Sequence, residues 1–284
     1  MTKQLLSKIE GCYSSMSKGH KRIADYITEN YDKAAFMTAA KLGDTVGVSE
    51  STVVRFASEL GFSGYPQLQK ALQEVVKSRL TSVQRMEAAG GEDMLEHAFS
   101  SDIETIKATR ESISREAFNA SVEVINHAKH IYVLGVRSAA SLASFAAFYL
   151  NFVYDSVALI EPAGTGEAFD QAFRINRDDV CIAISFPRYS KQTINMLRFI
   201  SDRGATVISV TDSENSPIAQ FATHLLLARS SMVSFVDSLV APLSLINALI
   251  AAAASEKSGE VYSNLSSLEN IWDEYQIYQT HEDE

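Results

Sequence analysis

The stretch GVSESTVVRFASELG, residues 47 to 61, combines hydroxyl side chains with one arginine at helical spacing. Ser51, Thr52 and Arg55 are expected to share one face of a helix, because residues three and four positions apart are neighbours on a helical surface. Hydroxyl and guanidinium groups donate hydrogen bonds to phosphate oxygens and to base edges. The stretch therefore suggests a nucleic-acid contact, while an ordinary helical hairpin stays open as the alternative.

The same stretch contains the signals for the helix that would carry these side chains. Ser49 is a suitable N-cap, and Gly61 can adopt the left-handed conformation that ends a helix. The apolar residues between them recur at i, i+3, i+4 and i+7, which predicts one buried stripe. The members of this stripe are Val53, Phe56, Ala57 and Leu60.

A second short helix is predicted directly upstream. Thr38 can cap the segment AAKLGDTVG, and Gly47 permits a tight turn before the next helix begins. Two short helices joined in this way form a helix-turn-helix, whose second helix enters the major groove of DNA. The candidate DNA-binding residues are Ser49, Ser51, Thr52 and Arg55, with Lys41 and Lys18 as phosphate contacts.

The distribution of charge separates the chain into two parts. Residues 1 to 80 carry 11 basic and 8 acidic side chains, a net charge of +3. The other 204 residues carry 14 basic and 27 acidic side chains, a net charge of −13, although the whole chain stands at −10. A basic N-terminal unit suits phosphate contacts, whereas the acidic remainder is a poor surface for nucleic acid. The 284 residues therefore suggest two domains with different tasks.

From residue 131 the pattern alternates between strand and helix. Five apolar runs separated by helical segments predict a parallel sheet that helices cover on both faces. The runs span residues 131–136, 156–161, 179–186, 205–212 and 223–230. The predicted fold class is thus an all-α helix-turn-helix domain followed by an α/β domain with a five-stranded parallel sheet.

Two loops of this sheet have side chains that suit a small anion. Ligands of such sheets bind at the carboxyl ends of strands, where helix N-termini present free N–H groups. Each individual serine also has the simpler interpretation of a helix cap. The candidate ligand residues are Gly135, Arg137 and Ser138 after the first strand and Ser185, Arg188, Tyr189 and Ser190 after the third.

With both halves considered, the sequence resembles the RpiR/MurR family of bacterial transcriptional regulators over nearly its whole length. The segment GVSESTVVRFASELGFSGYPQLQKAL looks like the helix-turn-helix signature of that family. The second domain is similar to the SIS (sugar isomerase) domain, with which the family senses phosphosugars. The resemblance implies a regulator that binds double-stranded DNA and whose effector is a phosphorylated sugar or a related small anion.

The chain departs from the patterns of that family at three places. Arg137 stands where the second glycine of Gly-x-Gly-x-Ser is usual, and Pro187 and Arg188 stand where Ser-x-Ser-Gly-x-Thr has serine and glycine. The effector could therefore be a small anion other than a phosphosugar. Gly43 replaces a frequent alanine, an exchange expected to cost little beyond helix propensity.

An enzyme with the same fold, such as a sugar-phosphate isomerase, is the rival hypothesis. Enolisation needs a positioned base, and Glu161, Glu167 and His224 are the candidates near strand ends. None of them forms an evident pair by spacing. The chain is therefore expected to have no catalytic residues, and no cofactor or metal is expected.

The remaining features predict cellular context and assembly. The cysteines Cys12 and Cys181 lie far apart, which favours free thiols in a reducing compartment, and the N-terminus lacks the apolar core of a secretory signal. We expect a cytoplasmic protein with no membrane span, because the apolar runs 142–153 and 239–254 fall short of the roughly 20 residues that a span needs. Apolar helices at 138–153 and 234–258 predict a homodimer or homotetramer.

The expected domain boundaries follow from these patterns. Residues 1–80 are assigned to the helix-turn-helix domain and residues 81–113 to a linker and connecting helix. Residues 114–284 are assigned to the SIS-like domain that binds the effector and forms the oligomer.

Overall fold

A computed structural model describes residues 8–9, 11–77, 81–88, 93–161 and 166–278 of the chain. The chain divides into two compact units, and the division falls between Asp93 and Met94. The first unit is all-α, apart from the segment Met232–Val236 that belongs to it, and the second unit is α/β. The fold class predicted from the sequence is confirmed, and the helix Met94–Ser112 belongs to the second unit.

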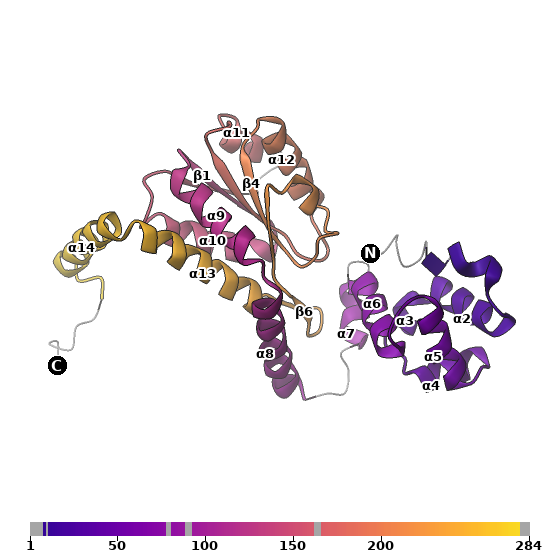
Figure 1. The fold of residues 1–284 in the computed structure, drawn as a ribbon. Helices are drawn as coiled ribbons and strands as arrows, with labels where there is room; N and C mark the ends of the chain where they lie inside the picture. Colours follow the sequence, from indigo (N-terminus) through magenta and orange to yellow (C-terminus); the bar gives the residue numbers. More distant parts are fainter. Residues whose placement is uncertain (1–7, 10, 78–80, 89–92, 162–165, 279–284) are drawn as a thin grey trace. The chain divides into compact units, whose positions relative to one another are not determined.

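The first unit is built from short helices around a single apolar core (Figure 1). In this core the side chains of Ile23, Leu42, Phe56 and Leu68 are fully buried. The helices are α2 (Lys18–Glu29), α3 (Tyr31–Ala34), α4 (Ala39–Val46), α5 (Glu50–Glu59), α6 (Tyr65–Lys77) and α7 (Ser82–Ala88).

The predicted stripe of α5 is the face that packs into this core. Val53, Phe56, Ala57 and Leu60 are all buried, while Ser51, Arg55 and Ser58 are exposed. Burying these side chains stabilises the unit by roughly 1.5 to 3 kcal/mol for each large one. The core thus decides which face of α5 is left for other contacts.

The second unit is built on the five predicted strands, all parallel and in the order β2-β1-β3-β4-β5. The strands β1 and β3 are buried along their whole length, as expected for a sheet covered on both faces. Their bounds are β1 (Ile131–Gly135), β2 (Val157–Ile160), β3 (Val180–Ile184), β4 (Thr206–Thr211) and β5 (His224–Leu227).

Helices cover the two faces of this sheet (Figure 1). On one face, α9 (Arg115–His127), α10 (Ala139–Leu150) and α13 (Val240–Glu256) pack against inward-facing residues of the strands. On the other face, α11 (Glu167–Ala172) and α12 (Lys191–Asp202) do the same. Two further helices, α8 (Met94–Ser112) and α14 (Ser258–Glu274), adjoin α13.

The sequence placed the start of the last apolar helix too early. Instead of a helix from residue 234, the chain forms a two-stranded hairpin of β6 (Ser231–Met232) and β7 (Asp237–Ser238), and α13 begins at Val240. The segment Ser234 to Ser238 has no helical periodicity of its own. The prediction wrongly extended the helix of the following apolar run back into this segment. In the described part of the chain, no helix is long and apolar enough to cross a membrane.

The segment 81–113, which the sequence assigned to a linker and connecting helix, contains the two helices α7 and α8. Met86 to Ala88 form the last turn of α7, and residues 89–92 lie outside the described residues.

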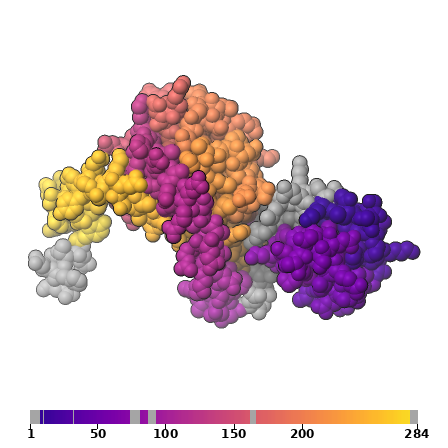
Figure 2. Space-filling model, viewed as in Figure 1, coloured from indigo at the N-terminus to yellow at the C-terminus, as the bar shows by residue number. Residues whose placement is uncertain are grey.

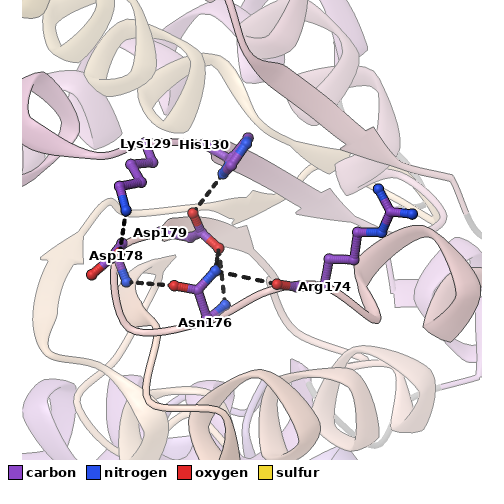
Figure 3. A network of polar contacts seen from close by, with 6 residues as sticks. All are labelled: Lys129, His130, Arg174, Asn176, Asp178 and Asp179. Atoms are coloured by element: carbon purple, nitrogen blue, oxygen red, sulfur yellow. Dashed lines mark hydrogen bonds and ion pairs between the residues drawn. The ribbon is translucent and has the colours of Figure 1, made fainter.

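A polar network closes the amino edge of the sheet, where β1 and β3 begin (Figure 3). The fully buried carboxylate of Asp179 accepts hydrogen bonds from His130 Nδ1 at 2.7 Å and from the backbone and side-chain nitrogens of Asn176 at 2.9 and 2.8 Å. Beside it, Lys129 Nζ lies 2.5 Å from Asp178 Oδ2. That hydrogen bond raises the pKa of Lys129 and lowers the pKa of Asp178. The network ties β1 to the turn before β3, whereas the candidate loops leave the opposite, carboxyl edge of the sheet.

Candidate DNA-binding helix and effector-binding loops

The turn between α4 and α5 depends on two glycines. Gly47 has φ 70°, and the guanidinium of Arg22 on α2 donates a hydrogen bond to its carbonyl oxygen. Gly43 lies so close to the turn that an added Cβ would stand 2.8 Å from the carbonyl oxygen of Val48. An alanine at position 43 would therefore meet backbone and not a flexible side chain, so this turn requires the glycine. Arg22 acts as a support of the turn.

Both helices of the motif have the predicted caps. The hydroxyl of Thr38 accepts from Lys41 N at 3.2 Å, and the hydroxyl of Ser49 accepts from Thr52 N at 3.3 Å. Each cap satisfies one of the free N–H groups of a first helical turn. At the other end of α5, Gly61 has φ 78°, which ends the helix in the predicted left-handed conformation.

The candidate residues of α5 lie together on its exposed face. Ser49 Oγ is 2.9 Å from Ser51 Oγ and 2.8 Å from Thr52 Oγ1, and Arg55 Nη2 reaches Ser51 Oγ at 3.5 Å. The three hydroxyls and the guanidinium thus form one continuous polar surface over the first turns of α5. We call Ser49, Ser51, Thr52 and Arg55 the α5 polar face.

Lys18 and Lys41, the predicted phosphate contacts, are both exposed. Lys18 begins α2 beside Gly19, whose added Cβ would stand 3.4 Å from Thr52 Cγ2, so the start of α2 lies against α5. His20 strengthens this packing, because its Nδ1 lies 2.6 Å from Glu59 Oε2 and its ring meets Phe56 edge-on. Lys41 lies in the first turn of α4. Lys18 is therefore next to the α5 polar face, and Lys41 extends the basic surface along the preceding helix.

In the second unit, the two candidate loops leave the same edge of the sheet. Strands β1 and β3 are neighbours, and the last residue of β1, Gly135, pairs with the last residue of β3, Ile184. The loop after β1 leads into α10, and the loop after β3 leads into α12. The structure thus brings the two predicted halves of the site to one place in the fold.

Both loops contain an arginine in the backbone conformation that favours glycine. Arg137 has φ 60° and Arg188 has φ 68°, and both side chains are exposed. A left-handed conformation costs a residue with a Cβ about 1–2 kcal/mol. At these two positions the related motifs have glycine. The backbone of this chain keeps the conformation of glycine there, and each arginine is therefore strained. Strain of this kind is characteristic of functional sites.

Most of the remaining loop residues support the loop backbone, and one of them has an exposed hydroxyl. Ser138 is exposed at the start of α10, with no cap bond from its side chain, whereas Ser190 caps α12 by accepting from Gln192 N at 3.2 Å. Ser185 is buried at the end of β3. Gly135 is structural, because an added Cβ would stand 2.4 Å from the carbonyl oxygen of Ala139. Ser138 is thus the hydroxyl most open to a ligand.

Sequence reasoning missed Asp212, which follows β4 at the same edge. Its Oδ1 accepts a hydrogen bond from the hydroxyl of Tyr189 at 2.6 Å and from Thr211 Oγ1 at 3.3 Å. From the sequence, Asp212 is only the last position of a predicted strand. The structure has β3 and β4 as neighbours, and this arrangement brings Asp212 to the loop after β3. Asp212 therefore holds the Tyr189 side chain in position at this edge of the sheet.

The candidates for an enzymatic base do not come together. Glu161 follows the carboxyl end of β2, whereas His224 is the first residue of β5 and so lies at the amino edge. Glu167 is exposed at the start of α11. No pair of general acid and base is formed from these three residues. Among the residues that the structure describes, no group of three His, Cys, Asp or Glu side chains is suited to hold a metal ion.

A cavity of about 440 Å³ lies at the amino edge, away from the candidate loops. It is lined by Lys129, Tyr154, Lys257 and Glu260, among others, and burial raises the pKa of Tyr154 above its ordinary value. Lys257 lies over the Tyr154 ring at 4.9 Å. The lysines there are engaged with Asp178 and with this ring, so the carboxyl edge remains the better candidate for an anion.

Two family models match the chain, one in each unit. Residues 3–79 match the helix-turn-helix domain of the rpiR family. Residues 124–252 match the SIS domain. The α5 polar face lies within the first match and both candidate loops lie within the second.

The similar proteins of known sequence are transcriptional regulators. The HTH-type transcriptional regulator HexR of Pseudomonas aeruginosa is 25% identical over 223 residues, which cover 78% of this chain and 77% of HexR. An uncharacterized HTH-type transcriptional regulator of Haemophilus influenzae is 26% identical over 230 residues, 78% of this chain and 79% of its own.

Solved structures with the same fold include the NanR protein of Vibrio vulnificus complexed with ManNAc-6P. It has a TM-score of 0.60 at 23% identity and covers 95% of this chain and 98% of its own. The sugar isomerase domain of an RpiR transcription factor from Sphaerobacter thermophilus has a TM-score of 0.58 at 28% identity, covering 61% of this chain and 96% of its own.

Proposed function

The chain belongs to the RpiR family of HTH-type transcriptional regulators with a SIS domain, and from this premise we propose which residues bind its ligands. The α5 polar face binds double-stranded operator DNA. The loops after β1 and β3 bind a phosphorylated sugar or a related small anion, and its binding changes the affinity for the operator. As an operator-binding protein, the chain acts in the cytoplasm.

The α5 polar face is the observation that carries the DNA-binding part. Four polar side chains lie on the exposed side of a helix whose opposite side is fixed in the core, so the helix can enter a groove without losing its packing. Arg55 is the base-reading or phosphate-binding cation, and Ser49, Ser51 and Thr52 are hydroxyl donors. Lys18 and Lys41 supply the salt-dependent phosphate contacts.

The paired loops support the effector site. Arg137 and Arg188 extend from adjacent parallel strands near helix N-termini, which favour anions. Ser138 and Ser190 add hydroxyls, while Gly135, Ser185 and Tyr189 shape the loops around them. That NanR is known in complex with a sugar phosphate makes this class the first to test. The usual motifs lack Arg137 and Arg188, so the set of candidate effectors also includes other small anions.

We further propose that the regulator is a homodimer or homotetramer, with residues 1–80 binding DNA, residues 81–113 connecting, and residues 114–284 binding effector and forming the oligomer. A two-fold dimer matches half-sites about one helical turn, roughly 34 Å, apart. The apolar helices α10 and α13 and the connecting helix α8 supply apolar surface for such an interface.

A titration of operator DNA with and without candidate effectors tests the proposal. The operator is first selected from genomic fragments by the protein itself. Sugar phosphates are then added, with the unphosphorylated sugars and inorganic phosphate as controls. We expect a sugar phosphate or related anion to change operator affinity by about 5- to 150-fold, and by linkage the operator to change effector affinity by the same factor. An effector that binds equally well to a variant with both Arg137→Ala and Arg188→Ala would place the site elsewhere.

A further inference from the structure

Val54 places an apolar side chain on the otherwise polar exposed side of α5. The structure describes all ten residues of this helix, and Val54 is the one large apolar residue among them that is exposed, to 39%. The other apolar side chains of α5, those of Val53, Phe56 and Ala57, are buried in the core of the first unit, which is coloured indigo to purple in Figure 2. Val54 is not part of that core, so core packing does not explain a valine at this position.

Helix formation does not explain this valine either. A β-branched side chain loses rotamer freedom against the preceding helical turn, so alanine, lysine or glutamate would favour an exposed helical position more. Single exposed apolar residues are common on protein surfaces, and exposure alone gives Val54 no role. Its place on the helix is the informative feature.

Val54 lies within the surface that α5 presents to DNA. Ser51 is three positions before it and Ser58 four positions after it, so both are its neighbours on the helical surface, and Arg55 follows it directly. All three neighbours are exposed. The second helix of a helix-turn-helix contacts base edges with its N-terminal residues, and Val54 is the fifth residue of α5. Its isopropyl group is therefore placed to meet a base edge when α5 enters the groove.

The polar neighbours of Val54 already have hydrogen bonds within the helix. The hydroxyl of Ser58 donates to the carbonyl oxygen of Val54 at 3.3 Å, so it is turned back towards the backbone. Ser51 Oγ lies 2.9 Å from Ser49 Oγ and 3.5 Å from Arg55 Nη2. Between Ser51 and Ser58, the contact of α5 with a base edge therefore depends on the isopropyl group of Val54.

Thymine is the base whose major-groove edge suits an isopropyl group. It presents a methyl group at C5, whereas the other groups on the base edges of this groove are hydrogen-bond donors and acceptors. An apolar side chain placed against a donor or acceptor removes water from it and gives no hydrogen bond in return, which costs free energy. Valine in a helix has one strongly preferred χ1 rotamer, so its methyl groups are in place before DNA binds.

We propose that Val54 contacts the C5-methyl group of a thymine in the operator and thereby selects thymine at that position. The proposal rests on the DNA-binding role proposed for α5, and it adds the base feature that one further residue of this helix reads. In a two-fold dimer the same contact occurs once in each half-site.

Replacement of thymine by uracil tests the contact, because it removes the C5-methyl group and keeps the hydrogen-bonding groups of the base. The full-length protein is titrated at fixed salt with duplexes of the operator that it selects, in which the thymines are replaced one at a time. At one thymine in each half-site, we expect the affinity of the wild-type protein to fall about fourfold, and about 15-fold when both half-sites are substituted. One methyl group buried against apolar surface corresponds to roughly this factor, and separated positions are roughly additive.

Val54→Ala completes a double-mutant cycle with the uracil duplex. This variant is expected to bind the thymine operator about 15-fold less tightly than wild type, and to bind the thymine and uracil duplexes equally within about twofold. Its thermal midpoint is expected to equal or exceed that of wild type, because alanine has the higher helix propensity and position 54 is outside the core. Weaker binding by this variant therefore does not arise from unfolding.

Val83→Ala is the matched control. Val83 is a valine of the same unit that is 67% exposed on another helix, α7. Val83→Ala is expected to keep both the operator affinity of wild type and its full response to uracil. A loss of the uracil response in this variant would show that the response does not report on residue 54.

The outcomes separate this proposal from the DNA-binding role of α5. If no thymine gives a uracil effect that Val54→Ala abolishes, or if the half-sites contain no thymine, the methyl contact is wrong while operator binding by α5 stands. A uracil effect of equal size in wild type and Val54→Ala would assign the methyl group to another residue or to DNA shape, and would also overturn the proposal. A wild-type protein that binds no operator would instead overturn the proposed function itself.

Discussion

Two arginines in left-handed positions are the feature that most distinguishes this effector site. Arg137 and Arg188 occupy places at which the related motifs have glycine, and the backbone has kept the conformation of glycine at both. The strain of about 1–2 kcal/mol at each is offset elsewhere in the fold. We interpret both side chains as anion-binding groups, because a charge-assisted contact contributes more than that strain costs.

Replacement of Arg188 separates this role from a purely structural one. Arg188→Ala and Arg188→Gly are both expected to weaken effector binding by about ten- to a hundredfold, corresponding to a contact of roughly 1.5–3 kcal/mol, while effector-free operator binding stays nearly unchanged. Arg188→Gly should be more stable to heat than Arg188→Ala, because glycine adopts the left-handed conformation without strain. Calorimetry and thermal unfolding measure the two effects.

Two serines, one in each loop, provide the controls for this prediction. Ser138→Ala and Ser190→Ala should weaken the same binding step less than Arg188→Ala does. Equal or tighter effector binding by Arg188→Ala would instead show that the arginine blocks the site.

Arg55 is the residue on which DNA recognition is expected to depend. Its guanidinium reaches Ser51 at 3.5 Å on the α5 polar face, so its removal leaves the core untouched. Arg55→Ala is expected to cost about 1–3 kcal/mol of specific operator binding if it reads a base, or to lower the salt slope by about one if it binds a phosphate. Ser58→Ala, also exposed on α5, is the matched control and should change operator affinity little. Anisotropy titrations at several salt concentrations measure both.

At the scale of elements, Gly135 allows a close approach of backbone that Gly259 does not need. An added Cβ at Gly135 would stand 2.4 Å from backbone of α10, whereas nothing lies within 4 Å of one at Gly259 in α14. Gly135→Ala is therefore expected to lower the thermal midpoint of the second domain by several degrees or to prevent its folding. Gly259→Ala should raise helix propensity and leave the midpoint equal or higher. A Gly135→Ala protein as stable as wild type would contradict the observed packing of β1 on α10.

The sheet interior gives a simple chemical check of its own. Burial raises the pKa of the Cys181 thiol on β3 to about 12, so at pH 8 it is protonated and shielded. We expect a thiol reagent at pH 8 to modify Cys12 readily in the native protein and Cys181 only after unfolding. The Cys12→Ser variant isolates the second reaction. Fast native labelling of that variant would show that the packing around β3 is looser than described.

Elements with local signals could be predicted from the sequence. Ser49 and Thr38 cap their helices as predicted, and the five strands lie where apolar runs stand between turns. Local chemistry decides such features, because a cap or an apolar stripe is complete within a few residues.

Features that depend on packing between distant segments could not be predicted from the sequence. The close approach of Gly43 to Val48, the meeting of Tyr189 with Asp212, and the hairpin before α13 all arise from neighbours that no local pattern specifies. The left-handed backbone of Arg137 and Arg188 was equally invisible, since arginine rarely adopts it.

At the scale of the whole molecule, the charge of this regulator is divided unequally between its two parts. The first 80 residues carry a net charge of +3 and the other 204 carry −13, so DNA contact is expected to be confined to the helix-turn-helix domain and to be strongly salt-dependent. The acidic second domain is expected to repel DNA. Its two loops with Arg137 and Arg188 are expected to bind a small anion instead.

Selection of genomic DNA fragments by the full-length protein, followed by sequencing, tests the central claim most directly. We expect the wild-type protein to enrich a small set of sites with two-fold related half-sites about one helical turn apart, and Arg55→Ala to lose this enrichment while folding normally. The claim would be contradicted if wild type enriched no sequence over competitor DNA, or if the Arg55→Ala protein recovered the same sites with the same affinity.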